Sequence, residues 1–445
     1  MLKTITRKFK LFFVGIRRSS LELVKSAGLL PLCNFIFMSP LKTYIDEEIL
    51  DRRDQSRITY LASEFIITIL LRFLEGSIRL FQHRCPGNNN FFKKIFQSGR
   101  VPHFTTLIYF LKKNKEDAHR ALERVMFRFS IWVLTKEIQR KNLKTITIDV
   151  DATAGSIYGK QEGAKRGYNP EKRNQPCFQL QVWTIRETKT LLRLELRNGS
   201  THCSSGILED LRILIPRLKT LGVKIRFIAD SGYESYEVLD YLESMAVGFV
   251  IAQKQRKTVK NAGKWAKNKQ KSLKYDSTLK ERRLETQRGI YRQIFVQVEK
   301  IYDEDGQIYF NEFLADEFTN VFVSNMAYKA ETIYGMYRNH AQVETIIGEL
   351  KSDLGAVKSR CHDFSVNQGI VQLCGIAYNM KVLYARSILQ SSDEIPNLRR
   401  LREEELNIPG YFSNHSGKLV FNVQSESFER FLKIANLVNL NRFAA

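Results

Sequence analysis

The stretch TITIDVDATAG, residues 145–155, decides the fold, because the character of the chain changes there. Its β-branched residues alternate with polar ones, as in a strand that buries one face. Before it, apolar residues recur at three- and four-residue intervals, which indicates helices. After it, strand and helix patterns follow one another. The stretch therefore opens an α/β part of the chain behind an all-helical N-terminal part.

Further strands and helices extend outward from this stretch. FQLQVWTIRE and LLRLELRNGS have strand patterns, and residues 204–222 form an amphipathic helix with a glycine stop. VKIRFIADSGY is a short apolar strand that ends at an acid, and a helix and the strand FVIAQK follow it. Antiparallel strands followed by strand, helix and strand predict an α/β fold with a mixed sheet and flanking helices.

The charge of the chain indicates its partner. Its 445 residues hold 70 Lys plus Arg against 47 Asp plus Glu, a net charge of +23. Such an excess favours a polyanion, most simply nucleic acid, with an anionic membrane surface as the alternative. The apolar runs are too short or too interrupted to span a membrane, so we expect no membrane partner. Six cysteines without a CxxC pair predict neither a zinc site nor disulfides, and hence a cytoplasmic protein.

The basic excess is concentrated in one segment. Residues 253–292 hold fourteen Lys or Arg against three Asp or Glu, a net charge of +11. A hairpin pattern follows at residues 292–317, around Asp-Glu-Asp-Gly. We therefore divide the chain into five parts: a helical DNA-binding domain (1–140), the first part of an α/β core (141–252), a basic β-rich insertion (253–320), the second part of the core (321–385), and a tail without an indicated role (386–445).

Acids at the ends of apolar strands indicate a site, because burying them is costly. Asp149 and Asp151 share one face of their strand, and periodicity cannot choose between them. Asp230 ends IRFIAD, where open α/β sheets place their ligands. With Glu344 they would make a carboxylate cluster that hard divalent cations such as Mg²⁺ or Mn²⁺ can hold. Any one of these acids alone is more often a cap or a salt-bridge partner.

Glu344 lies in YRNHAQVETIIGELK, residues 337–351. At about 100° per residue, Tyr337, His340, Glu344 and Lys351 would project from one strip of a single helix, about 60° wide. Such a strip is either one wall of a site or a solvated face.

The order of strand-Asp, strand-Asp, basic insertion and helix-Glu resembles the DDE transposases of bacterial insertion sequences. One subgroup has the signature Tyr, two residues, Arg, three residues, Glu, six residues, Lys. Tyr337, Glu344 and Lys351 match it, with His340 where arginine is usual, and Asp151-Ala152-Thr153 resembles the first acid's motif. GKQEGAKRGYN and VFVSNM are also similar to one branch, so the resemblance covers roughly residues 143–385.

The resemblance implies a ribonuclease-H-like core in which Asp151, Asp230 and Glu344 bind two Mg²⁺ or Mn²⁺ ions. Tyr337 and Lys351 would contact phosphates of the element's ends, with His340 in the arginine's place. His340 could not give arginine's bidentate contact. Trp265, in the insertion, would stack on a flipped base, although a lone tryptophan is more often part of a core.

We therefore predict a DNA transposase that cuts and joins double-stranded DNA, as a homodimer on DNA, in the bacterial cytoplasm at the nucleoid. The alternatives are a related metal-dependent nuclease and a DNA-binding protein derived from an inactive transposase. The presence of all three acids disfavours the inactive form. Metal-dependent nicking separates it from the two enzymes, and joining of a 3′-hydroxyl end separates transposase from nuclease.

Overall fold

The computed structural model describes residues 28–54, 58–78, 102–253, 266–272, 275–286, 289–299, 317–387, 395–415 and 418–423, and positions 23, 24, 26, 428, 429 and 432. Trp265 and residues 300–316, the turn and second half of the predicted hairpin, lie outside the described residues.

Nine strands form one mixed sheet in the order β4-β3-β2-β5-β6-β10-β9-β8-β7. Strands β2, β5 and β6 are parallel to one another, and every other neighbouring pair in this sheet is antiparallel. This confirms the predicted mixed sheet. The strands are β2 (Thr145–Ser156), β3 (Cys177–Ile185), β4 (Thr190–Asn198), β5 (Lys224–Ala229), β6 (Gly248–Ala252), β7 (Ala266–Ser272), β8 (Tyr275–Thr286), β9 (Gly289–Glu299) and β10 (Glu317–Ser324).

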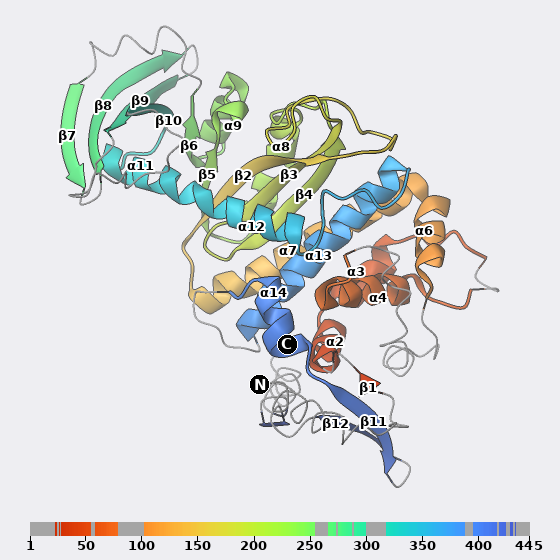
Figure 1. The fold of residues 1–445 in the computed structure, drawn as a ribbon. Coiled ribbons are helices and arrows are strands. Elements are labelled where there is room, and N and C mark those ends of the chain that lie inside the picture. Colours follow the sequence, from red (N-terminus) through yellow and green to blue (C-terminus); the bar gives the residue numbers. More distant parts are fainter. Residues whose placement is uncertain are drawn as a thin grey trace, which may run out of the picture.

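The insertion continues the main sheet. Its strands β7, β8 and β9 extend the sheet beyond β10, which pairs with β6 on its other side. Figure 1 shows these strands at one end of the molecule, beyond α9 and α11. The insertion and the core therefore share their hydrogen-bond ladder.

Helices cover both faces of the sheet. Buried residues of α8 and α9 form a hydrophobic core with one face of β2, β5 and β6. Helices α2, α4, α6, α7, α12 and α13 share another core with β3 and β4. The helices are α2 (Leu29–Met38), α3 (Leu41–Glu48), α4 (Ala62–Glu75), α6 (Phe104–Lys113), α7 (Lys115–Lys141), α8 (Ile207–Lys219), α9 (Tyr236–Ser244), α11 (Ala330–Arg338), α12 (Gln342–Ser352), α13 (Phe364–Ser387) and α14 (Leu398–Leu401).

Helix α13 joins the N-terminal helices to the sheet. Its buried apolar residues belong to the same hydrophobic core as those of α4 and α7, and the helix is buried on all sides. Figure 1 shows α13 running alongside α7 in the middle of the molecule. The described helices before residue 142 thus pack directly onto the second part of the core, and their DNA-binding role stays a prediction.

The segment 337–351 is not one helix, so the single strip predicted for it is wrong. Helix α11 ends at Arg338, a 3-10 turn η5 covers Asn339–Ala341, and α12 begins at Gln342. A 3-10 turn advances about 120° per residue, so the register shifts between Tyr337 and Glu344. The side chain of His340, in the turn, is buried against the sheet. A tertiary contact therefore accompanies the break in the helical pattern.

The C-terminal residues, which the sequence left unassigned, have structure of their own. After α14 come a π-helical turn η6 (Arg402–Leu406) and the strands β11 (Gly410–His415) and β12 (Lys418–Val423). These strands form a small sheet with β1 (Leu23–Val24), so the two ends of the described chain meet. Within the residues described, none of the helices combines the length and the apolar character needed to cross a membrane.

Candidate active site

One face of β2 lies beneath η5 and α12. Side chains on a strand repeat every two residues, which places Asp149, Asp151 and Thr153 on this face. His340 of η5 contacts Asp149, and Lys351 of α12 lies 3.4 Å from the hydroxyl oxygen of Thr153. The parallel neighbour β5 ends at Ala229 and leads directly into Asp230. The strand ends and the helix therefore bring the predicted acids to one edge of the sheet.

Asp149 is enclosed and neutralised. Its side chain is 1% exposed, and Arg186 binds both carboxylate oxygens, with Nε at 2.8 Å and Nη2 at 2.5 Å. Nδ1 of His340 lies 2.8 Å from Oδ1 of Asp149. Arg186 also donates from Nη1 to the carbonyl oxygen of Met336, at 2.7 Å. This Asp149 clamp (Asp149, Arg186 and His340) ties β2 to the end of α11 and to η5.

Asp151, two residues further along β2, has a different environment. Within the described parts of the chain, its carboxylate accepts one hydrogen bond, from the backbone N–H of Ala152 at 2.7 Å. The pKa of Asp151 is raised to about 6, mainly by burial and also by the charges of Asp230 and Glu344, while the Ala152 N–H and His340 act to lower it. Unlike Asp149, this carboxylate faces other acids and has no salt bridge to Lys or Arg among the described residues.

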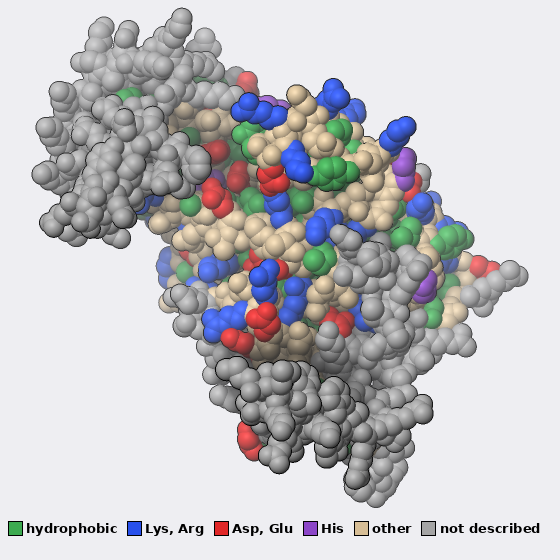
Figure 2. All heavy atoms as spheres, in the orientation of Figure 1, with side chains coloured by type: hydrophobic (Ala, Val, Ile, Leu, Met, Phe, Trp, Pro, Cys, Tyr) green, Lys and Arg blue, Asp and Glu red, His purple; other side chains and the backbone are tan. Residues whose placement is uncertain are grey.

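Asp230 and Glu344 complete the acidic group, and both are exposed. The hydroxyl of Tyr337 donates to Oδ1 of Asp230 at 2.5 Å. Burial raises the pKa of Tyr337, and so do Asp230, Asp151 and Glu344, so the phenol stays protonated and remains a donor. Figure 2 shows acidic side chains gathered where α11 and α12 meet the ends of β2 and β5.

The three acids have the oxygen ligands that a hard cation prefers. Their carboxylates do not yet lie close enough together to form a complete set of ligands. They offer only oxygen ligands, which Mg²⁺ and Mn²⁺ prefer. Across the described ranges, no salt bridge joins Lys or Arg to Asp151, Asp230 or Glu344, and His340 is the one base that lowers the pKa of Asp151. Nor does any set of three His, Cys, Asp or Glu side chains in those ranges come close enough together to hold one ion. The carboxylates would have to draw together around it.

The predicted DNA-contacting residues are placed differently from one another. Lys351 lies beside the acids, 2.5 Å from the carboxylate of Glu171. Tyr337 is half-buried over Asp230, whereas His340 is 8% exposed and held in the Asp149 clamp. For His340 to contact a DNA phosphate, its hydrogen bond with Asp149 would have to break. Trp265 lies outside the described residues.

The sequence reasoning missed Arg186. This residue follows β3, whose nine residues are all buried. A charged side chain directly after a fully buried strand is costly unless it is paired, and that could have marked it as the partner of a buried acid. Its target could not be read from the sequence, because Asp149 lies 37 positions away.

Comparisons with known proteins identify relatives of the chain. Residues 24–426 match the family described as transposase DDE domain group 1. The cryo-EM structure of the piggyBac transposase synaptic complex with hairpin DNA is 12% identical, with a TM-score of 0.42 over 84% of this chain and 78% of that one. The Mos1 transposase paired-end complex with left transposon end is 14% identical, with a TM-score of 0.17 over 45% of this chain and 61% of that one. No curated protein matches the chain. At such low identity and TM-score, neither structure locates functional residues here.

Proposed function

The chain belongs to the transposase DDE domain group 1 family and is a DNA transposase, and we propose that Asp151, Asp230 and Glu344 are its catalytic acids. They stand at the three positions that a DDE enzyme fills: an acid on the first core strand, an acid after a parallel neighbour strand, and an acid on a later helix. Cleavage and joining of the element's ends would take place at this edge of the sheet.

The environment of Asp151 carries the assignment. Of the two acids on the same face of β2, Asp149 is bound by Arg186 and His340, and Asp151 faces Asp230 and Glu344. An acid with two cationic or hydrogen-bonding partners has little capacity left for an ion. A carboxylate that faces other carboxylates needs a cation to offset their repulsion. Asp151 is therefore the first acid of the triad, and Asp149 is a structural one.

Members of this family generally use divalent metal ions. In this chain Asp151, Asp230 and Glu344 would hold two Mg²⁺ or Mn²⁺ ions, as three carboxylates without a Lys or Arg partner among the described residues suggest. When bound, the ions would neutralise phosphate charge and activate the attacking oxygen.

The protein's own residues have positioning roles. Tyr337 donates to Asp230 and holds its carboxylate in one orientation, as the N–H of Ala152 does for Asp151. The Asp149 clamp holds η5, and with it the start of α12 and Glu344, against β2. Lys351, on the side of α12 that carries Glu344, would exchange Glu171 for a backbone phosphate of the DNA. Much of phosphoryl-transfer catalysis is positioning of this kind.

The finer family assignment is also part of the proposal. The order β4-β3-β2-β5-β6, with β2, β5 and β6 parallel, supports a ribonuclease-H-like core. The spacing of Tyr337, Glu344 and Lys351 supports the insertion-sequence subgroup. Double-stranded DNA would be the substrate, bound by a homodimer, with Trp265 of the insertion stacking on a displaced base.

A plasmid cleavage and joining assay tests the function. We expect the purified protein to nick a plasmid that carries the DNA flanking its own gene, with Mg²⁺ or Mn²⁺ present, and to join the freed 3′-hydroxyl end to target DNA. Glu344→Gln should abolish both steps and keep DNA binding. Nicking without joining would identify a nuclease. Equal activity of the wild type and Glu344→Gln would remove Glu344 from the site.

A further inference from the structure

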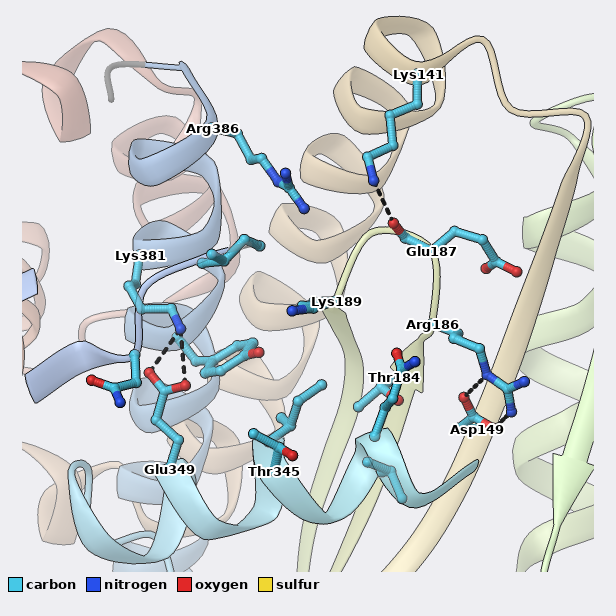
Figure 3. A pocket seen from close by; sticks show the side chains of 16 residues that line it. Lys141, Asp149, Thr184, Arg186, Glu187, Lys189, Thr345, Glu349, Lys381 and Arg386 are labelled. Carbon is cyan, nitrogen blue, oxygen red and sulfur yellow. Dashed lines mark hydrogen bonds and ion pairs between the residues drawn. The ribbon is translucent and has the colours of Figure 1, made fainter. Parts of the chain in front are cut away.

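A cavity of about 490 Å³ lies behind the acidic group, on the other side of α12. At about 100° per residue, Thr345 and Glu349, which line the cavity, point about 100° to 140° away from Glu344 around the helix. The turn after β3, the end of α7 and helix α13 supply the other walls, with Asn397 and Ile395 at the margin. Figure 3 shows the side chains of Lys189, Lys381, Arg386 and Glu349 around this space.

The cavity carries more positive than negative charge. Lys141, Arg186, Lys189, Lys381 and Arg386 line it, against Asp149, Glu187 and Glu349, an excess of two positive charges. Asp149 is taken up by the clamp, and the carboxylate of Glu187 accepts from the N–H and hydroxyl of Thr147. Arg386 has an acidic partner outside the lining, Glu137, whose Oε2 lies 3.7 Å from its Nε. Lys189 is left without an acidic partner in the described part of the chain.

Lys189 and Lys381 show the imbalance most clearly. Lys381 is 2% exposed and donates to both oxygens of Glu349, at 2.8 and 2.9 Å. Burial lowers the pKa of Lys381; Glu349 opposes this shift, and the charge of Lys189 adds to it. Lys189 forms no salt bridge with any acid in the described part of the chain, and Figure 3 shows its ammonium group directed into the cavity. Two lysines face one cavity and only Lys381 is bound to a carboxylate, which leaves a place for an anion beside Lys189.

The other walls suit a nucleotide-sized group. The volume lies within the range of about 300–1,000 Å³ that is typical of small-molecule sites. The ring of Tyr378 and the side chains of Ile346 and Ile395 offer apolar surface, and Thr345 and Asn397 offer hydrogen-bonding groups. A lysine-rich side and an apolar side match a phosphate on a nucleotide better than an acidic side chain, because a carboxylate lacks the flat apolar body.

We propose that this cavity binds the phosphate of a nucleotide, with Lys189 as its principal ligand and Lys381 behind it. The nucleotide is either free or the 5′-phosphorylated end of a DNA strand, since both present the same group. The site lies apart from the three catalytic acids and does not depend on their assignment.

Binding of phosphate probes to the full-length protein tests the proposal. The probes are adenosine monophosphate, and a short single-stranded oligonucleotide with either a 5′-phosphate or a 5′-hydroxyl. Lys189→Gln removes the cation, and Thr345→Glu places a carboxylate in the cavity. Lys219→Gln, on the exposed side of α8, is the control with the same change of charge. Asp151→Asn checks independence from the catalytic acids.

We expect Lys189→Gln to weaken probe binding about tenfold or more, because a charge-assisted hydrogen bond is lost. Thr345→Glu should weaken it further, because its carboxylate repels the phosphate. Lys219→Gln and Asp151→Asn should bind as the wild type does. Binding of adenosine monophosphate would identify a free nucleotide. A preference for the 5′-phosphorylated over the 5′-hydroxyl strand, without binding of the monophosphate, would identify a DNA end. Equal affinities of the wild type and Lys189→Gln for every probe, or no probe bound by the wild type, would overturn the proposal.

Discussion

The two sides of helix α12 differ in charge, although each side faces an aspartate of the same strand, β2. On the side of Glu344, Asp151 and Asp230 have no salt bridge to Lys or Arg among the described residues, and burial raises the pKa of Asp151. On the side of Glu349, bases outnumber acids, and Asp149 of the same strand is fully paired. Two aspartates two positions apart thus have opposite environments. Residue type alone does not decide whether an acid is structural or catalytic; the residues that pack against it do.

The largest expected effect is a loss of stability when Arg186, the partner of Asp149, is removed. Arg186→Gln would leave Asp149, with its 1% exposed side chain, without its bidentate cation. Breaking a buried pair in this way costs about 3–5 kcal/mol of folding free energy. Denaturant unfolding measures the loss. The control is Arg226→Gln, because the contacts of this arginine among the described residues are with the hydroxyl and the ring of Tyr328 and with no acid. Equal stability of the two variants would mean that the clamp does not hold α12 in place.

Removing the hydrogen bond that orients Asp230 should affect activity more than stability. Tyr337→Phe removes the hydrogen bond to Asp230 and keeps the ring that packs on Phe322. Loss of a group that orients a metal ligand typically costs about 10- to 100-fold in activity or metal affinity. Cleavage rates over a Mg²⁺ titration measure the effect. If Tyr337 only contacts DNA, DNA affinity will fall and the metal dependence will stay unchanged.

The smallest expected effect is that of His340→Gln, which tests whether His340 belongs to the Asp149 side of α12 or to the DNA-binding side. His340→Gln keeps a donor that can reach Asp149, so we expect a loss of about 1 kcal/mol of stability, typical of one weakened hydrogen bond, and unchanged DNA affinity. Lys351→Gln, on the acidic side, serves as the comparison and should weaken DNA binding and its salt dependence. A fall in DNA affinity for His340→Gln as large as that for Lys351→Gln would place His340 at the DNA backbone.

Much of this arrangement follows from local pattern. The alternation in TITIDVDATAG predicts β2 and puts Asp149 and Asp151 on one face, and the apolar run of β5 predicts Asp230 at a strand end. These features depend only on neighbouring residues. The break at Asn339–Ala341 could not be predicted in this way, because it accompanies a contact between residues 191 positions apart.

The Asp149 clamp and the basic cavity could not be predicted from the sequence for the same reason. Each is assembled from β2 or the turn after β3 together with helices that come about 150 or more positions later. Lys189, Lys381 and Glu349 are ordinary charged residues in the sequence, and only packing places them around one space. The resemblance of Asp151-Ala152-Thr153 to the first acid's motif already favoured Asp151, but Arg186, which gives Asp149 its different environment, could not be connected to either acid by a spacing rule.

The most direct test of the central claim compares Asp149→Asn with Asp151→Asn in one cleavage assay with Mg²⁺, with folding measured in parallel. We predict that Asp151→Asn folds as the wild type does, binds DNA and does not cleave it, because the first metal-binding carboxylate is lost. We predict that Asp149→Asn is destabilised by the unpaired Arg186 and that the fraction that folds still cleaves. The reverse result, with Asp149→Asn folded but inactive and Asp151→Asn still cleaving, would contradict the account and make Asp149, Asp230 and Glu344 the catalytic acids.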